Sequence, residues 1–257
     1  MIFTDTHTHL YLDDFDDDRE DVIKRAIDNN IKYMLLPNID SSSIKRLHDL
    51  CDRYPDNCLP MMGLHPTSVT ENYKEELEII KSQFLQRKYY AIGEIGIDLY
   101  WDKTFKEQQD YAFRKQIEWA IEMNLPIVIH ARDSFEEIFN VVDEMNCDEL
   151  TGVFHCFSGT KQQAEHIINY GGFKLGIGGV LTFKNSGLRE EIANIDLKHI
   201  ILETDSPYLT PAPHRGKRNE SSYINNIATL LSEMKNESLE TIAEITTNNA
   251  IDLFKFK

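Results

Sequence analysis

Two histidines near the start of the sequence stand two residues apart, in the stretch "THTH" at residues 6–9, and Asp5 comes just before them. Residues two apart share one face of a β-strand, whereas on a helix they point in different directions. Because the preceding residues 2–4 favour a strand, we expect Asp5, His7 and His9 on the same face. Neutral imidazole is the commonest metal ligand in proteins. An isolated pair of this kind is also typical of a solvated segment, so a metal site requires further ligands elsewhere.

Further polar residues with metal-ligand chemistry follow short apolar runs along the chain. Five of the nine histidines lie where such runs end, as do one glutamate and one aspartate: His7, His9, His65, His130, His155, Glu94 and Asp205. A buried polar group without a partner costs about 1–3 kcal/mol of folding free energy, so seven such residues are hard to explain as part of the hydrophobic core. A metal centre explains them, because their nitrogen and oxygen atoms would bind the cations. Four of these histidines and the two carboxylates exceed one tetrahedral shell. They suit two cations about 3.5–4 Å apart with a bridging carboxylate, and Glu94 is central in the strand order.

Short apolar runs rich in β-branched and aromatic residues recur along the chain, and segments with apolar residues at helical spacing lie between most of them. The predicted strands are residues 2–7, 32–36, 58–63, 89–95, 126–130, 151–155, 173–177 and 199–203. Helical spacing is present over residues 19–30, 106–124, 134–145 and 161–171. Residues 220–256 are predicted to form helices that close the fold.

This alternation of strands and helices is typical of βαβ units and a parallel sheet. Eight strands in this length predict an α/β protein, a (β/α)8 TIM barrel with residues 1–257 as a single domain. A doubly wound open sheet is the alternative, but no G-x-G-x-x-G motif follows the first predicted strand. A barrel places catalytic groups at the C-terminal ends of its strands, which is where the polar residues above fall.

The composition indicates an acidic protein of ordinary globular character. The 257 residues are 41% hydrophobic and 27% charged, and the net charge of −16 excludes a broad basic face that holds duplex DNA by counterion release. A nucleic acid would have to be held locally, by a few basic groups and metal cations. No apolar run spans a bilayer, no secretory signal is visible, and the four cysteines form no C-x-x-C pair. These features predict a cytoplasmic protein, with Cys156 in the core on the strand face opposite His155.

Seven short motifs occur in a fixed order along residues 3–220. They are "FTDTHTHL" at 3–10, "GLHP" at 63–66, "GEIGIDLYW" at 93–101, "HARDS" at 130–134, "HCFSG" at 155–159, "ETDSPYLTP" at 203–211 and "RGKRNE" at 215–220. This series resembles the TatD family of metal-dependent deoxyribonucleases. The resemblance implies a TIM-barrel hydrolase whose divalent cations are bound by two ligand sets: His7, His9, Glu94 and Asp205 for one ion, and Glu94, His130 and His155 for the other. Many relatives read G-x-H-P-H where this chain has Thr67, which affects a secondary substrate contact rather than the metal site.

Each of these residues has a predicted role in the chemistry. A pair of cations lowers the pKa of a water bound between them toward about 7, and the resulting hydroxide attacks phosphorus. Asp205 is the predicted general base or orienting group, with a helix cap as the alternative. His65 is expected to contact the substrate phosphate or the leaving group, with a core position before Pro66 as the alternative. Asp5 and Glu203 are predicted to accept hydrogen bonds from ligand imidazoles, unless one of them is a plain ion-pair partner.

Basic and aromatic residues near the strand ends are the predicted substrate contacts. Four cations are expected to bind the phosphate backbone: Arg132, Arg215, Lys217 and Arg218. For the last three, a solvated loop is the alternative. Four aromatic residues are expected to stack bases or to pack the rim: Tyr100, Trp101, Phe157 and Tyr208. The acidic stretch "DDFDDDRED" at 13–21 repels a polyanion if it faces the site, and supports the next helix if it points away.

The sequence therefore predicts a divalent-metal-dependent hydrolase that cleaves phosphodiester bonds of DNA. The substrate is expected to be single-stranded and attacked from an end, and the resemblance adds 3′ to 5′ polarity. The predicted cofactors are two divalent cations, and magnesium, manganese and zinc are all compatible with these ligands. Two alternatives stay open. One is an amidohydrolase-like or aminoacyl-ester hydrolase, such as a D-aminoacyl-tRNA deacylase, and the other is a metal-stabilised binding module without turnover.

Overall fold

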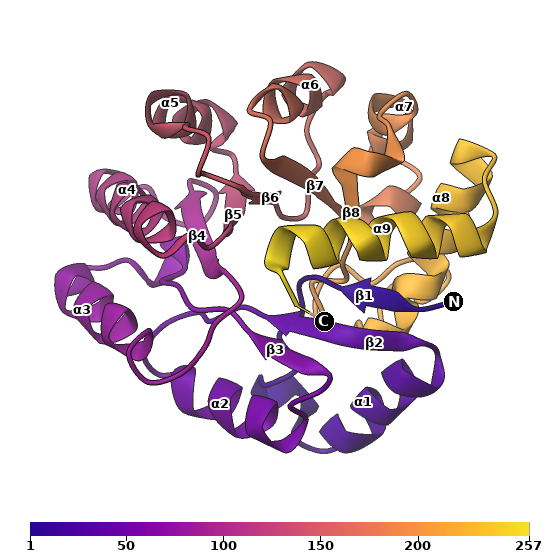
Figure 1. The fold of residues 1–257 in the computed structure, drawn as a ribbon, viewed down its shortest axis with the longest axis horizontal. Helices are drawn as coiled ribbons and strands as arrows, with labels where there is room; N and C mark the ends of the chain where they lie inside the picture. Colours follow the sequence, from indigo (N-terminus) through magenta and orange to yellow (C-terminus); the bar gives the residue numbers. More distant parts are fainter. Residues whose placement is uncertain (257) are drawn as a thin grey trace.

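Short parallel strands follow one another along the chain and form a barrel, seen end-on in Figure 1. The computed structural model describes residues 1–256. Within them the strands are β1 (Phe3–Asp5), β2 (Ile31–Leu36), β3 (Cys58–Pro60), β4 (Ile92–Asp98), β5 (Ile127–Arg132), β6 (Gly152–Phe154), β7 (Phe173–Ile177) and β8 (Ile200–Leu202). Each strand pairs in parallel with its sequence neighbour, in the orders β1-β2-β3 and β4-β5-β6-β7-β8. Single bridges from Thr8 to Ser206 and from Met62 to Ile92 join the two sheets, so the predicted TIM-barrel class is confirmed.

Helices surround the barrel in chain order (Figure 1). They are α1 (Arg19–Asp28), α2 (Ile44–Arg53), α3 (Tyr73–Gln83), α4 (Lys106–Met123), α5 (Phe135–Met145), α6 (Lys161–Asn169), α7 (Leu188–Ile192), α8 (Ile224–Lys235) and α9 (Leu239–Phe254). Short 3-10 helices connect some of them: η1 (Asp13–Phe15), η2 (Pro66–Ser68), η3 (Gly179–Thr182), η4 (Leu197–His199) and η5 (Ser221–Tyr223). Among the described residues, no helix has both the length and the apolar character needed to cross a membrane.

The inward face of the barrel is apolar toward the N-terminal ends of the strands and polar at their C-terminal ends. Val128 of β5 and Val153 of β6 belong to one buried apolar cluster with Ile201 of β8. Side chains alternate between the two faces of a strand, so the inward direction recurs two residues later at His130 and His155. The same hydrophobic packing that fills the barrel therefore directs these imidazoles toward its mouth.

Helix α9 covers the opposite, N-terminal end of the barrel (Figure 1). Its residues Leu253 and Phe254 join the apolar cluster inside the strands. Thr247 Oγ1 donates a hydrogen bond to the carbonyl of Ile2, just before β1, and Asn249 Nδ2 donates to that of Ile200 at the start of β8. The predicted closure of the fold by helices within residues 220–256 is thus confirmed.

The observed strand bounds differ from the predicted ones in a way that matters for the site. β1 ends at Asp5 instead of residue 7, and its register against β2 shifts between Phe3 and Thr4. β4 extends to Asp98 rather than ending at residue 95, and β5 extends to Arg132. The alternation of strand faces therefore ends at Asp5 in β1, and the extension of β4 adds a polar side chain, Asp98, on the face of Glu94.

Candidate metal centre

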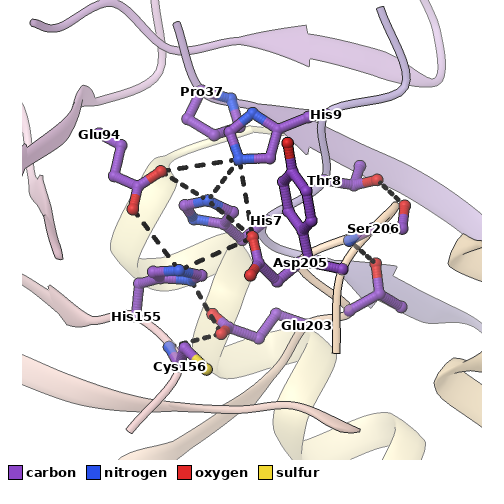
Figure 2. A network of polar contacts seen from close by, with 12 residues as sticks. His7, Thr8, His9, Pro37, Glu94, His155, Cys156, Glu203, Asp205 and Ser206 are labelled. Atoms are coloured by element: carbon purple, nitrogen blue, oxygen red, sulfur yellow. Dashed lines mark hydrogen bonds and ion pairs between the residues drawn. The ribbon is translucent and has the colours of Figure 1, made fainter. Parts of the chain in front are cut away.

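The polar residues predicted at strand ends meet at the C-terminal mouth of the barrel, as Figure 2 shows for most of them. Glu94 lies within β4 and His130 within β5, whereas the others follow the ends of their strands. His7, His9, Glu94 and His155 are buried, with at most 6% of each residue exposed. Residues separated by up to two hundred positions in the sequence thus form one cluster.

Four of the predicted ligands form a first group around His7. Its Nε2 lies 3.3 Å from Nε2 of His9 and 3.1 Å from Oε2 of Glu94. Oδ1 of Asp205 lies 3.8 Å from His7 Nε2 and 3.6 Å from His9 Nε2. The carboxylate of Asp205 therefore faces imidazoles rather than capping a helix, which was the alternative for this residue.

The second carboxylate oxygen of Glu94 faces a second group of histidines. Oε1 lies 2.8 Å from Nδ1 of His130 and 3.6 Å from Nε2 of His155. Nε2 of His65 is 3.3 Å from the same oxygen. Because its two oxygens face different groups, the Glu94 carboxylate lies where the predicted bridging position requires it.

The donor set fits divalent cations. The Nε2 atoms of His7 and His9 point at each other across 3.3 Å, and nitrogen lone pairs that converge in this way are suited to a shared cation. Three sets of ligand atoms lie close enough together to hold an ion: His7, His9 and Glu94; His65, Glu94 and His130; and His7, His155 and Glu203. Nδ1 of His7 is buried without a hydrogen-bond partner. Imidazole nitrogen and carboxylate oxygen are ligands for zinc, manganese and iron, and magnesium accepts the oxygens.

Electrostatics keep the carboxylates of the centre ionised. Burial acts to raise the pKa of the Glu94 carboxyl, but His65, His7 and His155 outweigh it and hold that pKa well below its usual range. Burial likewise acts against ionisation of Asp205, and His155 is the main group that lowers the pKa of Asp205 in spite of it. Both oxygens of each carboxylate are thus available as ligands.

Glu203 forms a close ion pair with a ligand imidazole but accepts no hydrogen bond from it, so the predicted position holds and the predicted hydrogen bond is not formed. Its Oε1 is 2.9 Å from Nδ1 of His155 and accepts a hydrogen bond of 2.6 Å from the backbone N–H of Cys156. The pKa of His155 is raised to about 10, because the carboxylates, Glu203 first among them, outweigh the effect of burial. Gly176 of β7 makes room for this arrangement, since a Cβ there would lie 2.3 Å from Glu203 Oε2.

The corresponding prediction for Asp5 is wrong. Its carboxylate accepts hydrogen bonds from the backbone N–H and the hydroxyl of Thr204, at 2.9 and 2.6 Å, and from the backbone N–H of His7 at 3.4 Å. It therefore connects β1 with the segment after β8 and does not contact an imidazole. Burial raises the pKa of Asp5 to about 7. The physical reason is that β1 ends at Asp5, so the strand alternation does not continue to His7 and the spacing of two no longer places both residues on one face.

Asp98 is a site residue that the sequence interpretation missed. Its Oδ2 lies 2.8 Å from Nε2 of His130, on the side of the ring away from Glu94. Asp98 is also buried, with 1% of its surface exposed. The available signal was its spacing of four from Glu94, which gives the same strand face once β4 extends far enough.

A cavity of about 530 Å³ opens above the metal ligands, and only one of the four predicted basic contacts lines it. That residue is Arg132. The side chain of Arg218 instead forms an ion pair of 2.7 Å with Asp18, and Arg215 donates to the carbonyl of Thr210. Within residues 1–256, neither these two arginines nor Lys217 contributes to the cavity wall. Asp18 of the acidic stretch 13–21 is thus neutralised by Arg218, one of the residues that were predicted to bind the substrate.

The aromatic predictions divide in the same way. Trp101 and Tyr208 line the cavity, with 69% and 51% of each residue exposed. Tyr100 is 53% exposed beside them, whereas Phe157 is 1% exposed and belongs to the core. Cys156, predicted to be in the core, instead lines the cavity, because its left-handed backbone with φ of 47° breaks the strand alternation after His155.

A family model described as TatD related DNase matches residues 4–255. The chain belongs to the TatD family. Among TatD-family relatives, it is 39% identical to YabD of Bacillus subtilis (strain 168), an uncharacterized metal-dependent hydrolase, over 99% of both chains. It is 30% identical to YcfH of Escherichia coli (strain K12), described in the same words, over 99% of this chain and 96% of that one.

A solved TatD structure has the same fold. The crystal structure of YjjV, a TatD homologue from Escherichia coli K12, superposes with a TM-score of 0.93 and 29% sequence identity, covering 99% of this chain and 98% of that one. With the convergent histidines and carboxylates described above, these matches identify a metal-dependent hydrolase of the TatD family.

Proposed function

We propose that this hydrolase cleaves phosphodiester bonds of DNA and removes nucleotides from an end of a single strand, with 3′ to 5′ polarity. The observation that carries the proposal is the placement of Glu94 between two groups of imidazoles at the base of a cavity that also contains Arg132. Two-cation centres with a nearby arginine suit phosphoryl transfer, because the transition state concentrates negative charge on phosphate oxygens. The family model, described as TatD related DNase, supports the same substrate class.

The proposed cofactors are two divalent cations, magnesium, manganese or zinc, and Glu94 would be a ligand of both. His7, His9 and Asp205 would complete the ligands of one ion, and His130 and His155 those of the other. When bound, such cations lower the pKa of a water molecule toward about 7 and offset the charge on the phosphate.

Asp205 is the proposed acceptor of the proton from the attacking water. Its side chain is 14% exposed toward the cavity, whereas that of Glu94 is 3% exposed. Water therefore reaches the Asp205 carboxylate more easily than the Glu94 carboxylate. The lowered pKa of Asp205, which His155 and His9 produce against the effect of burial, keeps it in the form that accepts a proton.

His65 is the proposed hydrogen-bond donor to the phosphate or the leaving group. Its Nδ1 accepts from the backbone N–H of Thr67 at 3.1 Å and lies 2.7 Å from the Thr67 hydroxyl. Nδ1 is thus an acceptor, so in the neutral ring the proton is on Nε2, which faces the centre. Burial lowers the pKa of His65, which favours this neutral form. Thr67, the departure from the common family motif, holds the ring in its orientation.

The cavity is suited to the end of a strand rather than to a length of duplex. Its volume of about 530 Å³ is in the range of small-molecule sites. The Arg132 guanidinium lies 3.9 Å from the ring centroid of Tyr100 and 5.2 Å from that of Trp101. A phosphate on Arg132 and a base on the exposed Trp101 ring would fill this side of the cavity.

A comparison of three substrates tests the proposal. Metal-loaded protein is incubated with 3′-labelled single-stranded DNA, bis-p-nitrophenyl phosphate and an aminoacyl ester, each with and without chelator. We expect chelator-sensitive release of mononucleotides from the labelled end. Hydrolysis of the ester with intact DNA would replace the proposal by the aminoacyl-ester alternative, and no turnover with any divalent cation would favour the binding module.

An Asp205 variant tests the role of the carboxylate. Asp205→Asn should abolish turnover and retain most of the bound metal. Asp196→Asn is the matched control, because that carboxylate caps η4 by accepting from the Lys198 N–H, away from the centre. Loss of all metal from the Asp205 variant would assign this residue to cation binding alone.

A further inference from the structure

Asp98 is a buried carboxylate at the end of β4 that is held from several sides. The residue is 1% exposed. Its backbone N–H donates to Gln109 Oε1 of α4 at 2.9 Å, so the position of the chain at this point is fixed by the surrounding helix. The carboxylate makes no ion pair with Lys or Arg within residues 1–256. Its contacts are to an imidazole and to backbone N–H groups.

One oxygen of Asp98 fixes the orientation of a metal ligand. Oδ2 lies 2.8 Å from Nε2 of His130, while Nδ1 of the same ring lies 2.8 Å from Glu94 Oε1. An ionised carboxylate accepts hydrogen bonds and cannot donate them. Nε2 of His130 therefore carries a proton that points to Asp98, and Nδ1 is the ring nitrogen that faces the metal centre.

The other oxygen of Asp98 holds the turn that carries the aromatic rim of the cavity. Oδ1 accepts hydrogen bonds from the backbone N–H groups of Tyr100 at 3.0 Å and Trp101 at 3.2 Å. The Arg132 guanidinium stacks on the rings of these two residues. Trp101 and Arg132 both line the cavity next to His130.

We propose that Asp98 is a positioning residue that connects the metal centre to the substrate-binding rim. Through Oδ2 it presents Nδ1 of His130 as a ligand, and through Oδ1 it holds the turn at residues 100–101 against Arg132. The part of the proposal that concerns the metal depends only on the hydrolase centre. The part that concerns substrate binding rests on the proposed phosphodiesterase function.

Two substitutions separate the two contacts. In Asp98→Asn, the amide oxygen still accepts from the turn, but the NH2 group donates toward His130 Nε2 and places the ring proton on Nδ1, where it opposes metal binding. In Asp98→Ala both contacts are lost. Asp102→Asn is the matched control, because the Asp102 carboxylate also accepts from a backbone N–H of this loop, that of Thr104 at 2.8 Å, and makes no contact with His130 in the described structure.

Metal affinity and the histidine tautomer report on the first contact. Competition with a chromophoric chelator should show 10–100-fold weaker binding of Zn²⁺ or Mn²⁺ to both Asp98 variants, and wild-type binding to Asp102→Asn. In the metal-free protein, ¹⁵N NMR of the His130 ring should show a protonated Nε2 in the wild type and an unprotonated Nε2 in Asp98→Asn. Wild-type metal affinity and an unchanged tautomer in that variant would overturn this half of the proposal.

Fluorescence of Trp101 reports on the second contact without any substrate. The other tryptophan, Trp119, is buried, so Trp119→Phe leaves Trp101 as the single emitter. Acrylamide quenching of Trp101 should rise in Asp98→Ala and stay at the wild-type level in Asp98→Asn. Equal quenching in all variants would overturn this half of the proposal.

Kinetics on metal-loaded protein complete the test. At saturating metal, Asp98→Ala should raise KM for single-stranded DNA more than Asp98→Asn does. If DNA is not a substrate of the wild-type protein, the proposed function fails while the metal, tautomer and quenching results still decide the role of Asp98. Circular dichroism of each variant checks that it is folded.

Discussion

Replacing Gly176 by alanine should displace the Glu203 carboxylate and thereby release the His155 ring. A Cβ at position 176 would lie 2.3 Å from Glu203 Oε2, whereas real Cβ atoms essentially never approach other atoms within 3.0 Å. The carboxylate must therefore retreat by about 0.7 Å or more, the difference between those two distances. Such a retreat disturbs the 2.9 Å ion pair between Glu203 Oε1 and His155 Nδ1.

The expected consequence is weaker metal binding with moderate destabilisation. Loss of the outer partner of a ligand histidine typically costs about 10–100-fold in metal affinity or activity. Inserting a methyl group into a filled site costs about 1–3 kcal/mol of unfolding free energy. Chelator competition measures the first effect, and urea unfolding of the metal-free protein measures the second.

Gly178→Ala is the matched control for this prediction. Its Cβ would approach Glu203 no closer than the backbone oxygen at 3.5 Å, an ordinary contact. The backbone at Gly178 has φ of −116°, which any residue adopts. Equal metal affinities for the Gly176 and Gly178 variants would refute the reasoning, because steric displacement of Glu203 is the only mechanism that separates them here.

Three further predictions concern the centre and the stability of the fold. Glu94→Gln should remove both cations, because this carboxylate faces both groups of histidines; elemental analysis that finds one bound equivalent would restrict Glu94 to a single site. Adding Zn²⁺ or Mn²⁺ to chelator-treated protein at 100 times its Kd should raise the unfolding free energy by about 2.7 kcal/mol per site, and an unchanged thermal midpoint would contradict binding to the folded state. Burial lowers the pKa of His48, whose Nε2 lies 2.7 Å from the Tyr89 hydroxyl. The unfolded chain therefore takes up the proton first, and stability falls as the pH drops through about 6.5. His48→Gln should reduce the loss of unfolding free energy between pH 7.5 and pH 5, and equal losses in denaturant titrations of both proteins would count against this assignment.

The sequence could predict the convergence of the ligands because it depends on topology. Once strands and helices alternate, the C-terminal ends of all strands lie on one side of the barrel. His130 and His155 then point inward because each stands two residues after a valine that packs inside. These features require only the period of a strand and the order of the elements.

The sequence could not predict where individual strands end or which charged residues far apart in the chain pair with each other. The contacts of Asp5 depend on where β1 ends, which the alternation of residue types does not show. Asp98 was missed because the predicted strand ended at residue 95. The pairing of Arg218 with Asp18 joins residues 200 positions apart, so a count of charges along the chain could not reveal that this arginine is already neutralised.

Helix α9 makes completion of the catalytic mouth depend on the opposite end of the molecule. It bonds to the chain beside both β1 and β8, the two strands whose extensions carry His7 and Asp205. On a translating ribosome, a nascent chain whose residues 239–254 have not yet emerged lacks these two hydrogen bonds at the N-terminal end of the seam between β1 and β8. We therefore expect the complete chain to bind cations more tightly than a nascent chain that lacks this helix.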